Sequence, residues 1–240
     1  MCTLAWGSDG RACWSVFNRD ERLGRPVAGP PSLQPGPSGP LLFARDPEGG
    51  GTWFAGSLHG FAVALLNHYP ACPERSPAGL RSRGLLVLDL AGGSSMASAR
   101  ERLSRCSLSR YAPFHLLVLG LEQADGWTWD GQHLRAFRPP DTFWTTSSWE
   151  PQQVVSWRRE WWRKQDAGSP VDPDRVSRLL RTFNPDQPAF GPTMEREDAR
   201  TVSQVEWRVT ESACRFVYRP RQAAGPGYDP PVVLEGNRAP

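Results

Sequence analysis

Lysine is nearly absent from this chain: of its 28 basic residues only Lys164 is a lysine, and the others are arginines. The arginines are scattered and stand against 25 acidic residues, which leaves a net charge of only +3 at pH 7. Proteins that track a phosphate backbone carry a concentrated basic stripe or patch, and none is visible here. We therefore expect no nucleic-acid partner.

Long apolar runs are missing too. No stretch approaches the roughly 18 apolar residues that a membrane-spanning helix needs, so we expect no membrane span. The first residues, 1 to 6, contain no basic segment and no long apolar stretch, so they lack the pattern of a secretory signal peptide. A cytoplasmic protein is the expectation.

Signatures of metals and cofactors are also absent. The cysteines form no CxxC pair, and their odd number argues against a disulfide framework; they are Cys2, Cys13, Cys72, Cys106 and Cys214. The four histidines lack the spacing of a zinc site, and there is no GxGxxG, P-loop, HExxH or GxSxG motif. We expect no metal and no dedicated cofactor.

Short apolar runs and turn signals are what the chain does have, and they predict β-strands. The expected strands are 3–6 with 13–17, 41–44, 52–57 with 61–66, 114–121, 126–129 with 133–137, 142–147, and 202–209 with 215–219. Helical spacing predicts helices over 83–90, 96–106, 151–165 and 172–183, with Ser94 or Ser95 and Asp172 as N-caps. In the third helix, Val154, Trp157, Trp161 and Trp162 are expected at helical spacing, although the neighbours Trp161 and Trp162 cannot share one face.

This order of elements predicts an α+β fold, in which antiparallel sheets are layered against helices. Prolines crowd residues 26–40, which we interpret as a loop or lid, and they recur after Pro220. We predict one domain over residues 1–220 and a loosely ordered, proline-rich tail over residues 221–240.

Cys2 stands at the head of the first expected strand, and Asn18-Arg19-Asp20-Glu21 ends the strand that pairs with it. Removal of Met1 would leave Cys2 with an α-amino group of pKa ~7.7–8.0, a suitable base for the adjacent thiol. An arginine across the hairpin would favour the thiolate. The residues alone leave an alternative open: a buried cysteine beside a charged turn.

Further motifs accompany this tetrapeptide, namely the Met1-Cys2 start, Gly50-Gly51-Thr52-Trp53, and Leu66-Asn67 at a strand end. Together they resemble the NRDE family, which is named after the tetrapeptide and includes transport and Golgi organisation protein two. The match is specific over residues 1–70. That family resembles N-terminal nucleophile hydrolases such as choloylglycine hydrolase, which implies an αββα sandwich of two antiparallel sheets flanked by helices.

The resemblance also implies a set of site residues. Cys2 takes the place of the nucleophile, and Arg19 that of the arginine near it. Asp20 is the candidate for the acid that contacts the terminal amine, although the hydrolases place it three residues after the arginine. Asn67 resembles the asparagine of the oxyanion hole. The other motif residues, expected to take part in binding, are Asn18, Glu21 and Trp53.

One segment departs from the family. The hydrolases carry a second asparagine after a threonine, and the NRDE family tends to have Ser-Asn there, whereas Thr145-Thr146-Ser147-Ser148 has no asparagine. Thr146 and Ser147 offer hydroxyl donors at that place. The late arginine of the hydrolases has only Arg200 as a candidate counterpart.

Two functions are compatible with these residues. The first is an amidohydrolase that acts on the C–N bond of a small acyl substrate. The second is a non-enzymatic protein that binds haem, a lipid or acyl-CoA, because NRDE-family members are linked to haem trafficking and lipid homeostasis. For haem, the candidate ligands are Cys72, which precedes Pro73, and His68, with His59 as a further one. In both cases the partner is a small molecule.

Overall fold

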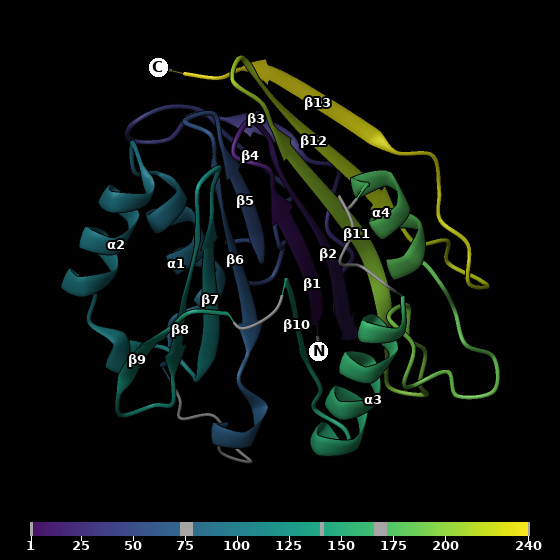
Figure 1. Cartoon of the computed structure of the whole chain (residues 1–240). Coiled ribbons are helices and arrows are strands. Elements are labelled where there is room, and N and C mark those ends of the chain that lie inside the picture. Colours follow the sequence, from purple (N-terminus) through teal and green to yellow (C-terminus); the bar gives the residue numbers. More distant parts are fainter. Residues whose placement is uncertain (1, 73–78, 140–141, 166–171, 240) are drawn as a thin grey trace.

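Two antiparallel β-sheets lie face to face, and helices cover both outer faces of the pair (Figure 1). The computed structural model describes residues 2–72, 79–139, 142–165 and 172–239. This is the α+β sandwich that the sequence predicted. Pro73 and Met1, which entered the sequence argument, lie outside the described residues. Within the described part of the chain, no helix has the length and apolar character needed to cross a membrane.

The first sheet has six strands in the order β10-β1-β2-β11-β12-β13. Their bounds are β1 (Cys2–Ser8), β2 (Cys13–Arg22), β10 (Phe143–Thr146), β11 (Ala199–Val209), β12 (Ala213–Pro220) and β13 (Val232–Asn237). The hairpin of β1 and β2 turns at Asp9, whose carboxylate accepts hydrogen bonds from the backbone N–H groups of Arg11 and Ala12. That turn fixes the register in which Cys2 lies opposite Arg19.

The second sheet has seven strands that follow one another in chain order, β3 to β9. Their bounds are β3 (Ser32–Gln34), β4 (Leu41–Phe43), β5 (Phe54–Ser57), β6 (Phe61–Asn67), β7 (Phe114–Leu119), β8 (Ala124–Trp129) and β9 (Leu134–Phe137). The expected hairpins β5–β6 and β8–β9 are both present. The proline-rich segment, expected as a loop, contains the short edge strand β3.

Four α-helices flank the sheets: α1 (Arg83–Ala91) and α2 (Met96–Arg105) pack on the second sheet, α3 (Pro151–Lys164) and α4 (Pro173–Leu180) on the first. Short 3-10 helices span Tyr69–Ala71 and Leu108–Arg110. Ser95 and Asp172 are N-caps, as predicted. Gly51 lies against the start of α1, so that an added Cβ would come within 2.1 Å of the Gly84 carbonyl carbon. This close approach explains a glycine of the Gly50-Gly51-Thr52-Trp53 motif.

Large apolar side chains fill the space between the two sheets. Phe17, Phe54 and Phe216 form tilted ring contacts there, and Trp207 packs on the bare backbone of Gly56. A second apolar cluster lies between the second sheet and helices α1 and α2. The inner cluster holds the sheets together, and its edge contacts Cys2.

Two expectations about helices and the tail need correction. Helix α3 buries Val154, Arg158 and Trp162, at spacings of four residues, whereas the expected Trp157 and Trp161 are only partly buried. A search for apolar residues at helical spacing misses this buried stripe, because its central residue is Arg158. The segment over 221–240, predicted to be loose, contains β13, which pairs with β12 and packs Leu234 against the inner core. Alternating apolar residues at Val232 and Leu234 suit an edge strand despite the preceding prolines.

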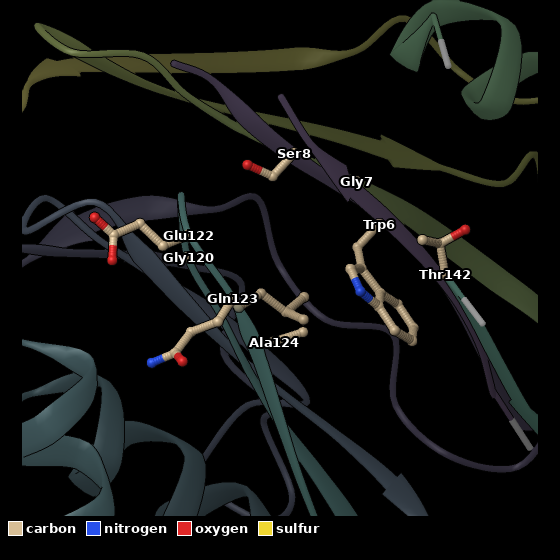
Figure 2. Close-up of a pocket in the computed structure, with 9 residues that line it drawn as sticks. Trp6, Gly7, Ser8, Gly120, Glu122, Gln123, Ala124 and Thr142 are labelled. Atoms are coloured by element: carbon tan, nitrogen blue, oxygen red, sulfur yellow. The ribbon is translucent and has the colours of Figure 1, made fainter. Parts of the chain in front are cut away.

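A small cavity lies at the far end of β1 from Cys2 (Figure 2). Its volume is about 130 Å³, and it is lined by Trp6, Gly7, Ser8, Leu119, Gly120, Glu122, Gln123, Ala124 and Thr142. The six residue steps along β1 from Cys2 to Ser8 span roughly 20 Å. The cavity is therefore separate from the residues that the sequence singled out.

Candidate functional site

Cys2 begins β1, which is an inner strand of the first sheet. It lies opposite Arg19 on β2 and opposite Thr146 on β10. Directly opposed residues of an antiparallel sheet point to the same face, so these three side chains share the face that looks toward the second sheet. There the half-buried Cys2 packs against the edge of the inner core. The register thus brings together three of the predicted site residues.

The guanidinium of Arg19 is engaged by acidic and aromatic neighbours. It lies 3.1 Å from Glu21, 3.9 Å from Asp46, and 4.0 Å above the ring centre of Trp53. Asp46 also pairs with Arg25 at 2.6 Å. The predicted motif residues Glu21 and Trp53 therefore act on Arg19, and Asp46 and Arg25 are site residues that the sequence argument missed.

Burial dominates the protonation of the Cys2 thiol and raises its pKa to about 11, with the Asp20 and Glu21 carboxylates also raising it. The expectation of a thiolate at Cys2 is wrong for this structure, because burial outweighs any lowering of the pKa by nearby positive charge. Arg19 itself pairs with Glu21 and Asp46. Cys2 is thus a neutral thiol at pH 7. Attack by its sulfur requires a base that takes the proton during the reaction.

Asn67 ends β6 on the second sheet, and its Nδ2 donates a hydrogen bond to Oη of Tyr69 at 3.0 Å. Tyr69 packs beside Met194 and Ala199. Burial raises the pKa of the Tyr69 phenol, and the hydrogen bond from Asn67 offsets part of that rise. Tyr69 was not predicted. Its position two residues after Asn67 is the sequence feature that could have identified it as a site residue.

Asp20 lies on the other face of the first sheet, beneath α3. Its Oδ1 accepts a 2.6 Å hydrogen bond from Thr201, and its Oδ2 is 3.5 Å from Nη1 of Arg158. Both charged side chains are completely buried. The pairing strand β11 has a bulge between Thr201 and Ser203, next to Asp20 and Arg19. Arg158, like Asp46, Arg25 and Tyr69, was not predicted from the sequence.

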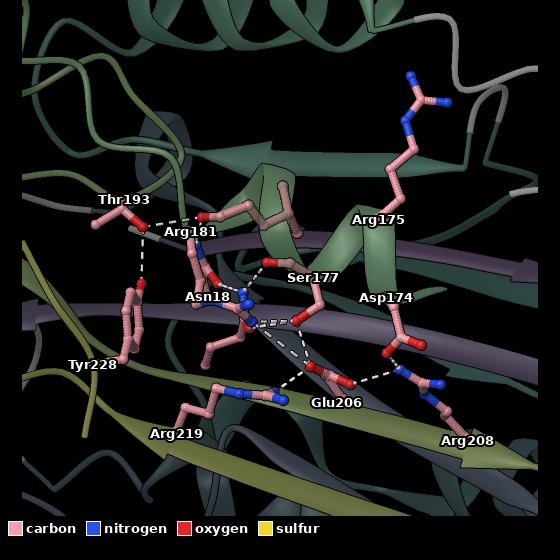
Figure 3. Close-up of polar contacts among 12 residues, drawn as sticks. Asn18, Asp174, Arg175, Ser177, Arg181, Thr193, Glu206, Arg208, Arg219 and Tyr228 are labelled. Atoms are coloured by element: carbon pink, nitrogen blue, oxygen red, sulfur yellow. Dashed lines mark hydrogen bonds and ion pairs between the residues drawn. The ribbon is translucent and has the colours of Figure 1, made fainter. Parts of the chain in front are cut away.

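Asn18, a predicted binding residue, is instead tied into the packing of α4. Its Nδ2 donates to the carbonyl oxygens of Leu180 at 2.6 Å and Pro192 at 2.9 Å, and its Oδ1 accepts from Gln204. Figure 3 shows Asn18 beside a polar network around the buried carboxylate of Glu206. That network contains Ser177, Arg181, Arg208 and Arg219. Asn18 fixes the first sheet to its helical layer.

The β10 segment supplies hydroxyl groups on both faces of the first sheet. Thr146 is beside Cys2, and its buried Oγ1 has no hydrogen-bond partner among the described residues. Thr145 points to the opposite face, where its Oγ1 donates to the Cys2 carbonyl oxygen at 3.2 Å. Ser147 is buried and hydrogen-bonds to the Trp149 backbone, which closes the turn before α3. Thr146 is therefore the hydroxyl nearest to the nucleophile position.

The three candidate haem ligands, His68, Cys72 and His59, each have different neighbours. His68 packs on His115 with ring centres 4.4 Å apart, and burial lowers the pKa of His68. Cys72 follows a 3-10 helix, and the Nε2 of His59 is 2.8 Å from the Ser38 carbonyl oxygen. Within the described ranges, no three His, Cys, Asp or Glu side chains are grouped to hold a metal ion.

Arg200, the candidate for the late arginine, points away from Cys2. Its Nη1 donates to the Ala223 carbonyl oxygen at 2.6 Å, and its Nη2 to that of Gln222. Arg200 therefore anchors the segment after β12. Besides Arg19, a second buried arginine near the start of β1 is Arg158.

A sequence model for a family described as Transport and Golgi organisation 2 matches residues 1–165. No match was found among curated proteins. One similar solved structure is the Caenorhabditis elegans ortholog of N-acylethanolamine-hydrolyzing acid amidase, at TM-score 0.58 and 10% identity, covering 86% of this chain and 92% of that one. Another is a mutant conjugated bile acid hydrolase from Clostridium perfringens, at TM-score 0.53 and 10% identity, covering 99% and 98%. At this identity the likeness establishes the fold, which is that of N-terminal nucleophile hydrolases.

Proposed function

The chain belongs to the Transport and Golgi organisation 2 family, and from that premise we propose that it hydrolyses amide C–N bonds with Cys2 as an N-terminal nucleophile. The observation that carries this proposal is the register of β1. It places Cys2 between Arg19 and Thr146, on the face directed toward the second sheet. The two hydrolases of similar fold support the same reaction class.

The reaction begins after removal of Met1, which gives Cys2 a neutral α-amino group. As the sulfur attacks the amide carbon, the S–C bond forms and the thiol proton passes to this amine. The tetrahedral oxyanion is held by Asn67 Nδ2, which exchanges its bond to Tyr69 for the substrate, and by the Thr146 hydroxyl. The C–N bond then breaks, and the ammonium returns its proton to the leaving amine.

Water completes the cycle. It attacks the thioester carbon while the α-amino group of Cys2 takes up one of its protons, and the S–C bond breaks to release the carboxylic acid. The proton then returns to the sulfur and regenerates the thiol. A thiol of pKa about 11 fits this scheme, because the sulfur is deprotonated only during attack.

A panel of N-acyl 4-nitroanilides with short, long and aromatic acyl groups tests the proposal. We expect release of nitroaniline by the wild-type protein and none by Cys2→Ala. The matched control is Cys106→Ala, because Cys106 lies at the end of α2 and outside the site. Equal rates for wild type and Cys2→Ala would refute the nucleophile.

A second candidate function is binding of haem, a lipid or acyl-CoA without turnover. The observation that favours it is the engagement of Arg19 by Glu21, Asp46 and Trp53, which leaves Cys2 a weakly acidic thiol. Titration with ferric haem tests the haem branch, with a Soret shift of defined stoichiometry expected that Cys72→Ala or His68→Ala abolishes. Unchanged spectra in both variants would reject those two residues as ligands. Binding of a fluorescent acyl-CoA tests the lipid branch.

A further inference from the structure

We propose that Arg158 is a positioning residue for Cys2, joining the Asp20 carboxylate and the backbone of Cys2 in one buried network beneath β1. The proposal rests on the proposed function, in which Cys2 is the N-terminal nucleophile. Arg158 comes from α3, far from Cys2 in sequence, and lies outside the motifs quoted above at residues 1–2, 18–21, 50–53 and 66–67.

The network consists of short polar contacts on the face of the first sheet that α3 covers. Nη1 of Arg158 donates to Oγ1 of Thr3 at 3.0 Å and to Oγ1 of Thr145 at 3.2 Å, and it is 3.5 Å from Oδ2 of Asp20. Thr145 in turn donates to the Cys2 carbonyl oxygen at 3.2 Å. One guanidinium nitrogen therefore connects the acid to the residue that carries the nucleophile.

A further donor of Arg158 connects α3 to the segment between α4 and β11. Its Nε donates to the Phe190 carbonyl oxygen at 2.9 Å. The Arg158 side chain is 0% exposed, and so is that of Asp20. Removing two charges from water costs several kcal/mol per ion, and well-packed apolar residues would often fill such a place at lower cost. A solely structural role is therefore a poor explanation for an arginine here.

Two atoms of this pair lack hydrogen bonds among the described residues, Nη2 of Arg158 and Oδ2 of Asp20. The strand register offers an explanation for the unpartnered Oδ2 of Asp20. Cys2 lies opposite Arg19, so Asp20 lies alongside the point where the chain enters β1. After removal of Met1, the α-amino group of Cys2 occupies that point, and Oδ2 is an acceptor for it.

The charges around Arg158 determine what it does to the nucleophile. The titratable and charged groups that act on Arg158 are Asp20, Cys2 and Arg196. Tyr228 interacts with Asp20. Asp20 alone would raise the pKa of the Cys2 amine and thiol, since an anion disfavours loss of a proton. The positive charge of Arg158 offsets that effect. It keeps the amine in its basic, neutral form near pH 7, and it favours proton loss from Cys2.

Peptide-resolved labelling of Cys2 with brief pulses of iodoacetamide from pH 6 to 12.5, a range that includes the thiol pKa of about 11, tests the proposal, with Cys106 as an internal reference. We expect Arg158→Met to move the midpoint of the Cys2 profile up by about one pH unit and to slow labelling at pH 7 about tenfold. Arg158→Lys should restore most of the rate, because the charge returns. Arg159→Met is the matched control. Arg159 neighbours Arg158 on α3, contacts Trp144 instead of Asp20, and should leave the midpoint in place.

A merely structural role gives a different result. Arg158→Met would then lower the melting temperature and leave the pH midpoint of Cys2 unchanged, which would overturn the proposal. If Arg158→Met does not fold, Thr145→Val removes the link to the Cys2 carbonyl oxygen and retains the charge. It should slow labelling at every pH without a midpoint shift, and an unchanged rate would overturn the proposal. Labelling needs no amide turnover, so a shifted midpoint without hydrolysis rejects the hydrolase and retains the positioning role.

Discussion

The substitution Gly56→Ala tests the stacking of the two sheets. A Cβ at Gly56 of β5 would lie 2.5 Å from both Cε3 and Cζ3 of Trp207 on β11, well inside ordinary van der Waals contact. Trp207 is 1% exposed and has Phe216 on its edge, so the ring cannot move aside. We expect the overpacking to cost about 2–3 kcal/mol, near the upper end for such changes. That corresponds to a drop in melting temperature of about 5–10 °C for a chain of this size.

Thermal and urea unfolding measure the effect, and a double-mutant cycle assigns its cause. Trp207→Leu removes the ring, so adding Gly56→Ala to it should cost less than about 1 kcal/mol more. Gly24→Ala is the control, since nothing lies within 4 Å of a Cβ there, and we expect a change within about 0.5 kcal/mol. A Gly56→Ala protein as stable as wild type, or strictly additive effects with Trp207→Leu, would refute the face-to-face packing.

Further predictions concern the tail, a histidine and a helix cap. Deleting residues 231–240 should lower the melting temperature by about 5–10 °C, because β12 loses its neighbour and Leu234 its core contact; a change under 2 °C would mean that β13 does not pack. Burial lowers the pKa of His115 from 6.5 to about 3, so the stability it contributes is complete above pH 6.5 and falls by about 2 kcal/mol at pH 5. His115→Gln should remove this fall in the free energy of unfolding between pH 6.5 and 5, measured by urea unfolding at several pH values. An unchanged pH dependence would contradict the burial effect. Asp172→Ala should cost about 1 kcal/mol by removing the N-cap of α4, measured against the exposed Asp186→Ala.

Local signals gave the strands and the geometry around Cys2. The turn at Asp9 and the apolar runs on either side determine the β1–β2 hairpin, and the hairpin determines that Cys2 faces Arg19. The helix caps Ser95 and Asp172 were predictable for the same reason, since a cap depends on residues within one turn. The motifs at Asn18 and Asn67 located two strands of different sheets correctly.

Contacts between distant segments could not be derived in this way. Asp46 follows Arg19 by 27 residues and Arg158 follows Asp20 by 138, and no local pattern joins either pair. Burial is the main reason that the predicted thiolate at Cys2 is replaced by a neutral thiol, and the Asp20 and Glu21 carboxylates raise the pKa of that thiol further. The strand β13 was missed because prolines before Val232 indicated a loose tail, whereas edge strands tolerate prolines at their start.

The mass of the N-terminal peptide, before and after incubation with an N-acyl 4-nitroanilide substrate, tests the central claim most directly. The proposed mechanism requires that the peptide begins at Cys2, with Met1 removed, and that a substrate acyl group adds to the Cys2 sulfur during turnover and leaves on hydrolysis. We expect both masses from protein made in bacteria, and the acyl adduct should be absent from Cys2→Ala. A peptide that retains Met1, or turnover without any adduct at Cys2, would contradict the mechanism.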